Sequence, residues 1–132
     1  MENVRNWIKK NQKYWENDGP IFNFAIVDAV KNELVGMVEA NTDSKSLEGV
    51  EEGEANISYG LYPSARGKGY TSRAINLLVG FLKNKGIKRA IIRVDPGNID
   101  SLKVPERLGF SKEGKIVTKQ GENLQIFVKN LT

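Results

Sequence analysis

The sequence contains no cysteine and no histidine among its 132 residues. These absences exclude disulfide bonds, thiolate nucleophiles, serine–histidine triads and the usual zinc sites, so we expect no bound metal. No apolar run approaches the roughly 20 residues that a membrane-spanning helix requires, so we expect no membrane partner. Any catalysis must therefore use carboxylates, hydroxyls, lysines, backbone amides or a bound cofactor.

The chain also lacks a strong charge of one sign, because 20 lysine and arginine residues face 16 aspartate and glutamate residues, a net +4. Zinc-finger spacing, a basic region with heptads and an aromatic RNA-binding signature are all missing, so we expect no nucleic-acid partner. A basic nucleic-acid-binding domain remains the weakest alternative, supported only by the mild positive charge. The amino terminus is mixed and charged, unlike a secretory signal, which predicts a cytoplasmic location.

Hydrophobic periodicity predicts a single domain over residues 1–132 in which helices and strands alternate. Helices are expected at residues 2–16, 70–85 and 98–108. Strands are expected at residues 21–28, 34–40, 55–62, 88–95, 110–117 and 124–129. The strand–helix–strand unit at 55–95 should form a right-handed crossover, which makes its two strands parallel. The order therefore predicts an α/β domain of the α+β type with a mixed sheet and flanking helices.

A short basic segment with two glycines lies where the third strand passes into the helix at 70–85; it consists of Arg66, Gly67, Lys68, Gly69 and Tyr70. A helix start presents unpaired N–H groups and favours phosphate, and glycine lets the backbone close on the phosphate oxygens. From this segment alone, an anion site and a ligand-free tight turn are equally well supported. Thr71 and Ser72 do not complete a P-loop or a dinucleotide fingerprint, so ATP and NAD are disfavoured.

This loop and two flanking stretches resemble the GNAT superfamily of N-acetyltransferases, most closely its branch of ribosomal-protein N-terminal acetyltransferases. Residues 66–70 match the family's pyrophosphate signature Q/R-x-x-G-x-G/A through its fifth position, and Thr71 stands in the sixth. The stretch at 57–63 is similar to the family's central strand. Downstream, Asn-x-x-Ser at 98–101 precedes Gly-Phe at 109–110, an interval that is specific when it accompanies the loop.

The resemblance implies acetyl-CoA as the co-substrate, bound where the strands at 55–62 and 88–95 splay apart. Backbone groups of the first strand would bond the pantetheine arm, and residues 66–71 would hold the pyrophosphate. Asn98 would contact the pantetheine arm, although a plain helix N-cap is at least as good an interpretation of this residue. The residues expected to bind acetyl-CoA are Gly60, Leu61, Tyr62, Arg66, Gly67, Lys68, Gly69, Tyr70, Thr71 and Asn98.

The resemblance further implies direct transfer of the acetyl group to a primary amine in a ternary complex. Ser101 matches the position of the leaving-group acid, and its alternative role is a first-turn serine that bonds its own helix. A backbone N–H near Leu61 is the expected oxyanion donor. Related proteins often carry a glutamate where this chain has Asn56, so Glu54 becomes the candidate base, acting through water, with Glu51 or Glu52 of the preceding loop as alternatives. A solvated acidic segment is the commoner outcome for such a residue.

The absence of a glutamate at position 56 favours an acceptor whose amine has a low pKa. A larger fraction of an α-amine, with a pKa of about 8, is neutral near pH 7 than of a lysine amine at about 10.4. The predicted acceptor is therefore a peptide or protein N-terminal amine, or a small amine. The alternative function is a catalytically weak CoA-binding module that acts in regulation or interaction.

Two departures from the family lead to further expectations. Pro105 stands where many members carry a helical tyrosine acid, and it predicts a kink or an early break in the helix at 98–108. Members usually carry a strand and a helix before the helix at 2–16, and the resemblance implies that this chain lacks them. The exposed sheet edge would then be available for a homodimer.

Overall fold

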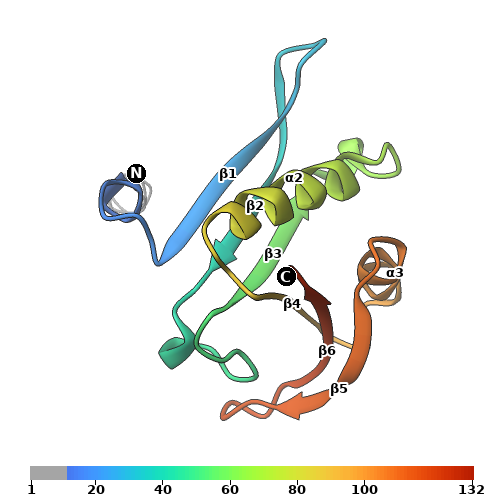
Figure 1. The fold of residues 1–132 in the computed structure, drawn as a ribbon. Helices are drawn as coiled ribbons and strands as arrows, with labels where there is room; N and C mark the ends of the chain where they lie inside the picture. Colours follow the sequence, from blue (N-terminus) through green and yellow to red (C-terminus); the bar gives the residue numbers. More distant parts are fainter. Residues whose placement is uncertain (1–11) are drawn as a thin grey trace.

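A computed structural model describes residues 12–132, which form one six-stranded mixed sheet in the order β1-β2-β3-β4-β6-β5 (Figure 1). The strands are β1 (Ile21–Asp28), β2 (Glu33–Asn41), β3 (Glu54–Leu61), β4 (Arg89–Val94), β5 (Ser111–Val117) and β6 (Asn123–Asn130). The helices are α2 (Tyr70–Asn84) and α3 (Ile99–Arg107), with short 3-10 turns at η1 (Ser44–Ser46) and η2 (Pro63–Ala65). The predicted fold class is confirmed.

The strand directions also agree with the prediction. The crossover through α2 makes β3 and β4 parallel, and all other neighbouring strands are antiparallel. Residues 12–16 are helical, and the rest of the helix predicted at 2–16 lies outside the described residues. No helix among residues 12–132 combines the length and apolar character needed to cross a membrane.

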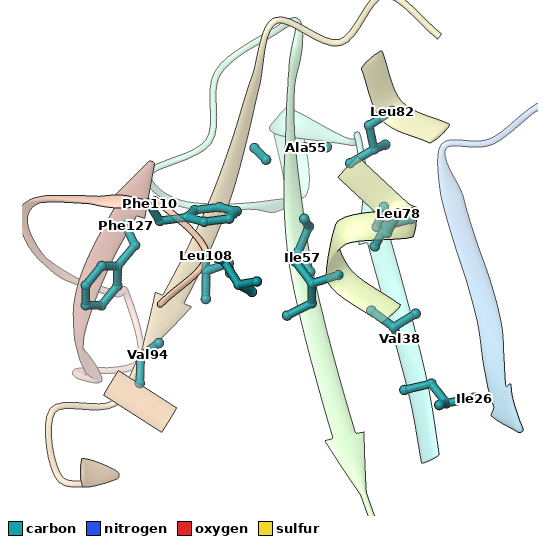
Figure 2. Close-up of a cluster of buried hydrophobic side chains, with 14 of the residues drawn as sticks. Ile26, Val38, Ala55, Ile57, Leu78, Leu82, Val94, Leu108, Phe110 and Phe127 are labelled. Atoms are coloured by element: carbon teal, nitrogen blue, oxygen red, sulfur yellow. The ribbon is translucent and has the colours of Figure 1, made fainter. Parts of the chain in front are cut away.

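Both faces of the sheet carry apolar side chains, because successive residues of a strand point to opposite faces. The larger cluster lies on the face that α2 and α3 cover, and its members include Ala55, Ile57, Leu78, Leu82, Leu108 and Phe127 (Figure 2). A smaller cluster on the opposite face comprises Val50, Ile91, Ile126 and Val128, with Leu47 packed against it. The residues between β2 and β3 therefore contribute to the cover of this second face.

Helix α3 runs from Ile99 to Arg107 without the break that was expected at Pro105. Proline has no N–H, so it removes the helical bond that residue 105 would donate to the Ser101 carbonyl. The Tyr59 hydroxyl of β3 donates to that carbonyl instead, at 3.4 Å. Pro105 is fully buried and lies in the last turn, with only two helical residues after it, where proline disrupts little. The expected early break is therefore wrong.

A double-mutant cycle tests this compensation. Tyr59→Phe should lower the free energy of unfolding by about 1 kcal/mol, because the Ser101 carbonyl loses its donor. In a Pro105→Ala background the same change should cost clearly less, because the substituted alanine restores the helical N–H. Urea unfolding of the four proteins gives the coupling, and an equal cost in both backgrounds would contradict the account.

Candidate functional site

Strands β3 and β4 pair over only a short stretch and then diverge. Their partners are Glu54 with Arg89, Ala55 with Ala90 and Asn56 with Ile91. Both strands continue past this point, β3 to Leu61 and β4 to Val94, and Figure 2 shows them spreading apart in the direction of the chain. The sheet is thus open between two of its inner strands, which is where the resemblance places acetyl-CoA.

The antiparallel bonding to β2 shows which backbone groups of β3 face this opening. The Tyr62 N–H donates to the Val35 carbonyl at 2.9 Å. Because bonded and non-bonded positions alternate along an antiparallel pair, Gly60 and Tyr62 direct their amides to β2, whereas Tyr59 and Leu61 direct theirs to β4. Of residues 60–62, only Leu61 therefore directs its backbone groups into the opening, and Tyr59 does the same.

The loop after η2 leaves the start of α2 uncapped and open. Gly67 and Gly69 both have left-handed backbones, with φ of +80° and +78°, and no atom lies within 4 Å of where a Cβ would stand. Gly69 is the N-cap of α2, and no side chain caps this end. The first N–H groups of α2 thus lack an intrahelical partner and open toward solvent. Together with the helix dipole, they form an open cradle whose polarity favours an anion.

A cavity of about 550 Å³ joins this cradle to the opening between the strands. The predicted residues that line it are Gly60, Leu61, Arg66, Gly67, Gly69, Tyr70, Thr71, Asn98 and Ser101. Within the part of the chain that the structure describes, the lining leaves out Tyr62, Lys68 and Glu54. The structure therefore brings the loop and the start of α3 together, as the resemblance implies, and separates them from the candidate base.

Glu54 lies elsewhere and has a different role. Its carboxylate forms an ion pair with Arg89 at 3.2 Å and accepts the Glu51 N–H at 2.8 Å. It is buried at the paired end of β3 and lines a separate cavity of about 470 Å³, together with Arg89 and Glu113. A base must reach the reacting amine directly or through water, so the structure gives no support to Glu54 in that role.

The start of α3 contributes a fixed pair of polar groups to the cleft. The Asn98 side-chain oxygen accepts the Ser101 N–H at 3.2 Å, which confirms the predicted N-cap. This bond orients the Asn98 amide and ties the two residues to one geometry. Ser101 is half-buried and belongs to the lining of the cleft.

Five further residues line the cleft and were not predicted from the sequence: Tyr59, Ser72, Lys103, Val104 and Arg107. Burial raises the pKa of the Tyr59 phenol, which keeps it protonated as a donor. Lys103 and Arg107 are four residues apart on α3 and therefore lie on one face of the helix. With Arg66 they place three cationic side chains around the cavity, which suits a polyanion. The four-residue spacing of Lys103 and Arg107 is the feature of the sequence from which this basic pair could have been predicted.

A hydrogen bond attaches the first residue of α2 to the β1–β2 hairpin. The Tyr70 hydroxyl donates to the Asp28 carboxylate at 2.5 Å. This bond, with the Lys31 and Val30 amides, lowers the pKa of Asp28, and the same bond raises the pKa of Tyr70. Tyr70 therefore belongs to the lining of the cleft while its hydroxyl is held by Asp28.

The Asp28–Tyr70 bond should make stability depend on pH in a defined way. Because folding lowers the pKa of Asp28, the contribution of its carboxylate is complete above about pH 4 and is lost as the pH falls through the folded value. Tyr70 has a raised pKa, so its contribution is complete below about pH 10 and disappears above that. The difference in melting temperature between the wild type and Asp28→Asn should shrink below about pH 4. A difference that stayed constant down to about pH 2 would contradict this.

Known proteins resemble this chain in sequence and in fold. The model of a family described as acetyltransferase (GNAT) domain matches residues 1–111. An uncharacterized N-acetyltransferase p20 from Bacillus licheniformis is 30% identical over 98 residues, which are 74% of this chain and 52% of that protein. The chain thus spans about half the length of this curated relative.

Solved structures share the fold at lower identity. A ribosomal-protein-S5-alanine acetyltransferase from Vibrio fischeri superposes with a TM-score of 0.82 at 22% identity, covering 98% of this chain and 71% of that one. A spermidine N-acetyltransferase from Vibrio cholerae, solved as a dodecamer, gives a TM-score of 0.76 at 18% identity, with 98% and 74% covered. At these identities the likeness concerns the fold alone.

Proposed function

Because the chain belongs to the acetyltransferase (GNAT) domain family, we propose that it moves an acetyl group from acetyl-CoA to a primary amine. The acceptor in this proposal is the α-amine of a peptide or protein, or a small amine of low pKa. Transfer is direct, within a ternary complex, since the chain has no cysteine to carry the acetyl group. No group of three or more acidic side chains that could hold a metal occurs among residues 12–132.

The proposal rests on one observation, which is that the free edge of β3 and the anion cradle lie in the same cleft. The inner edge of β3 offers the Leu61 and Tyr59 backbones to an extended ligand, as a neighbouring strand would use them. The cradle at Gly67 and Gly69 lies in the same cavity and offers helix N–H groups to an anion. An elongated molecule with a diphosphate in the middle and an amide-containing arm at one end satisfies both features.

The residues at the inner end of the cleft suit acyl transfer. Acetyl-CoA supplies an acetyl thioester; the amine nitrogen bonds to the acyl carbon, the carbon–sulfur bond breaks, and one amine proton passes to water, from which Ser101 regains the proton that it gives to the sulfur. The Leu61 N–H is the donor for the acyl oxygen, a type of contact that contributes roughly 3 kcal/mol in other enzymes. Ser101 is the hydroxyl that would supply a proton to the departing sulfur. Each group lies on the lining of the same cavity.

A second candidate function is a CoA-binding module with little catalysis. It is favoured by the lack of a free carboxylate for the role of base. Asn56 stands in place of the family glutamate and accepts a hydrogen bond from Arg93. Glu54 forms an ion pair with Arg89. An amine that is already neutral needs no such base. The substrate preference for α-amines and the weak-catalysis alternative therefore follow from the same substitution.

Binding and transfer can be tested separately. Acetyl-CoA at about 100 times its dissociation constant should stabilise the fold by about 2.7 kcal/mol, which a thermal shift detects. Release of CoA across a panel of peptides, small amines and aminoglycosides then separates an enzyme from a binding module. A thermal shift without CoA release from any acceptor would favour the module, and the absence of both would overturn the proposal.

A further inference from the structure

A group of polar side chains lies on the sheet face opposite α2 and α3, at the point where β3 and β4 diverge. Asn56 is the last residue of β3 that pairs with β4, and Arg93 stands two positions beyond its partner Ile91. Ile57 and Val94 belong to the core on the helix side. Since neighbouring residues alternate in direction, Asn56, Ser58 and Arg93 face the other way. They do not belong to the lining of the cleft; they lie on the other face of the sheet, beside the point at which the pairing of β3 and β4 ends.

These three side chains form a chain of hydrogen bonds with a fixed direction. The Arg93 Nε donates to the Asn56 Oδ1 at 3.0 Å, and the Asn56 Nδ2 donates to the Ser58 Oγ at 3.2 Å. Guanidinium has donors and no acceptor, so the amide oxygen must face Arg93 and the amide nitrogen must face Ser58. Ser58 thus receives a bond on its oxygen and keeps its own proton to donate.

This chain of hydrogen bonds is held in place at its Arg93 end and is open at its Ser58 end. Arg93 is half-buried and also donates to the Glu48 carbonyl at 3.2 Å, so its guanidinium has little freedom to turn. Ser58 is exposed, and within residues 12–132 its hydroxyl donates no hydrogen bond. The Ser58 hydroxyl, the free donor of this chain of hydrogen bonds, therefore points to solvent beside the opening.

An acidic side chain lies next to this donor. Glu39 of β2 is the register partner of Ser58, so both side chains project from the same face as direct cross-strand neighbours. Glu39 is half-buried. A carboxylate attracts an amine or ammonium group, whereas the Ser58 hydroxyl requires an oxygen acceptor. The two requirements are met together by a molecule that carries an amine and a carbonyl oxygen on adjacent carbon atoms.

We propose that Glu39 and Ser58 form the acceptor subsite, and that Ser58, oriented through Asn56 and Arg93, donates to the carbonyl oxygen next to the acceptor's amine. The inference rests on the proposed acetyl transfer and narrows its acceptor to an α-amino-acyl group, whether in a peptide or in an amino-acid amide. Polyamines and alkylamines carry no such oxygen and leave the Ser58 donor unused. Asn56 and Arg93 are positioning residues in this account.

The test compares two acceptors of similar shape, alaninamide and 2-aminopropane, with rates expressed per neutral amine. Ser58→Ala should lower kcat/KM for alaninamide about 5- to 10-fold and that for 2-aminopropane less than about 2-fold. Ser58→Thr, which keeps a hydroxyl, should restore most of the alaninamide rate. Glu39→Gln should lower both rates together. Ser111→Ala, an exposed serine on β5, is the matched control and should change neither.

An equal effect of Ser58→Ala on both acceptors, or no effect on either, would overturn the inference while leaving acetyl transfer established by the wild-type rates. If the protein releases no CoA, a binding measurement tests the inference instead. In the presence of CoA, alaninamide should shift the NMR signals of the Asn56 side-chain amide, and 2-aminopropane should not. Identical shifts from both compounds, or none from either, would also overturn the inference.

Discussion

Glutamate in place of Gly69 should weaken acetyl-CoA binding by on the order of 100-fold or more, equivalent to about 3 kcal/mol. The new side chain would project into the open space above the helix start, because no atom lies within 4 Å of the Cβ position. There it would occupy the anion cradle and bring a negative charge against the pyrophosphate. Titration calorimetry with acetyl-CoA measures the change directly.

The variant needs a control, because Gly69 has a φ of +78° and any side chain strains that backbone. Gly86 at the other end of α2 has a φ of +83° and equally open surroundings, so Gly86→Glu adds the same charge and a similar strain of about 1–2 kcal/mol. Gly86→Glu should lose at least as much stability as Gly69→Glu, because its carboxylate opposes the helix dipole at the C-terminal end, but only Gly69→Glu should lose affinity. Equal affinities for the two variants would refute the assignment of the cradle.

Removal of the Glu54 carboxylate should cost stability and leave transfer intact. Glu54→Gln leaves Arg89 without its buried partner and removes the charged acceptor of the Glu51 N–H. We expect a loss of about 1–3 kcal/mol, moderated because Arg89 stays partly hydrated. Urea unfolding gives this loss, and kcat at saturating acceptor should change less than about 2-fold because Glu54 lies outside the cleft.

Glu113→Gln provides the comparison, because Glu113 pairs with the same Arg89 at 3.0 Å but is half exposed. An exposed ion pair contributes about 1 kcal/mol at most. Glu54→Gln should therefore be the more damaging variant. A stable Glu54→Gln protein with a kcat reduced about 100-fold would instead restore Glu54 as the base.

Local patterns in the sequence were sufficient for much of the fold. Alternation along β3 and the apolar stripe of α2 placed both elements within about two residues, because both follow from the pitch of the backbone. The glycine loop and the Asn98 cap were also predicted, since each depends on neighbours close in the chain. Such features need no knowledge of tertiary packing.

The parts that could not be predicted depend on partners far apart in the sequence. Pro105 is tolerated because Tyr59, which lies 42 positions before Ser101, donates to the Ser101 carbonyl. Glu54 forms an ion pair with Arg89 on a neighbouring strand. The orientation of Ser58 depends on Arg93 through Asn56. In each case the residue type was visible, but its partner was fixed only when the sheet brought the strands together.

The central claim is that the cleft between β3 and β4 holds acetyl-CoA and delivers its acetyl group to an amine. Because the protein has no cysteine, a thiol-reactive dye reports only the CoA that is released. With acetyl-CoA and alaninamide, we predict a saturable release of CoA that requires both the protein and the amine and is lost in Gly69→Glu. Release at the uncatalysed rate from wild-type protein with every acceptor in the panel would contradict the claim.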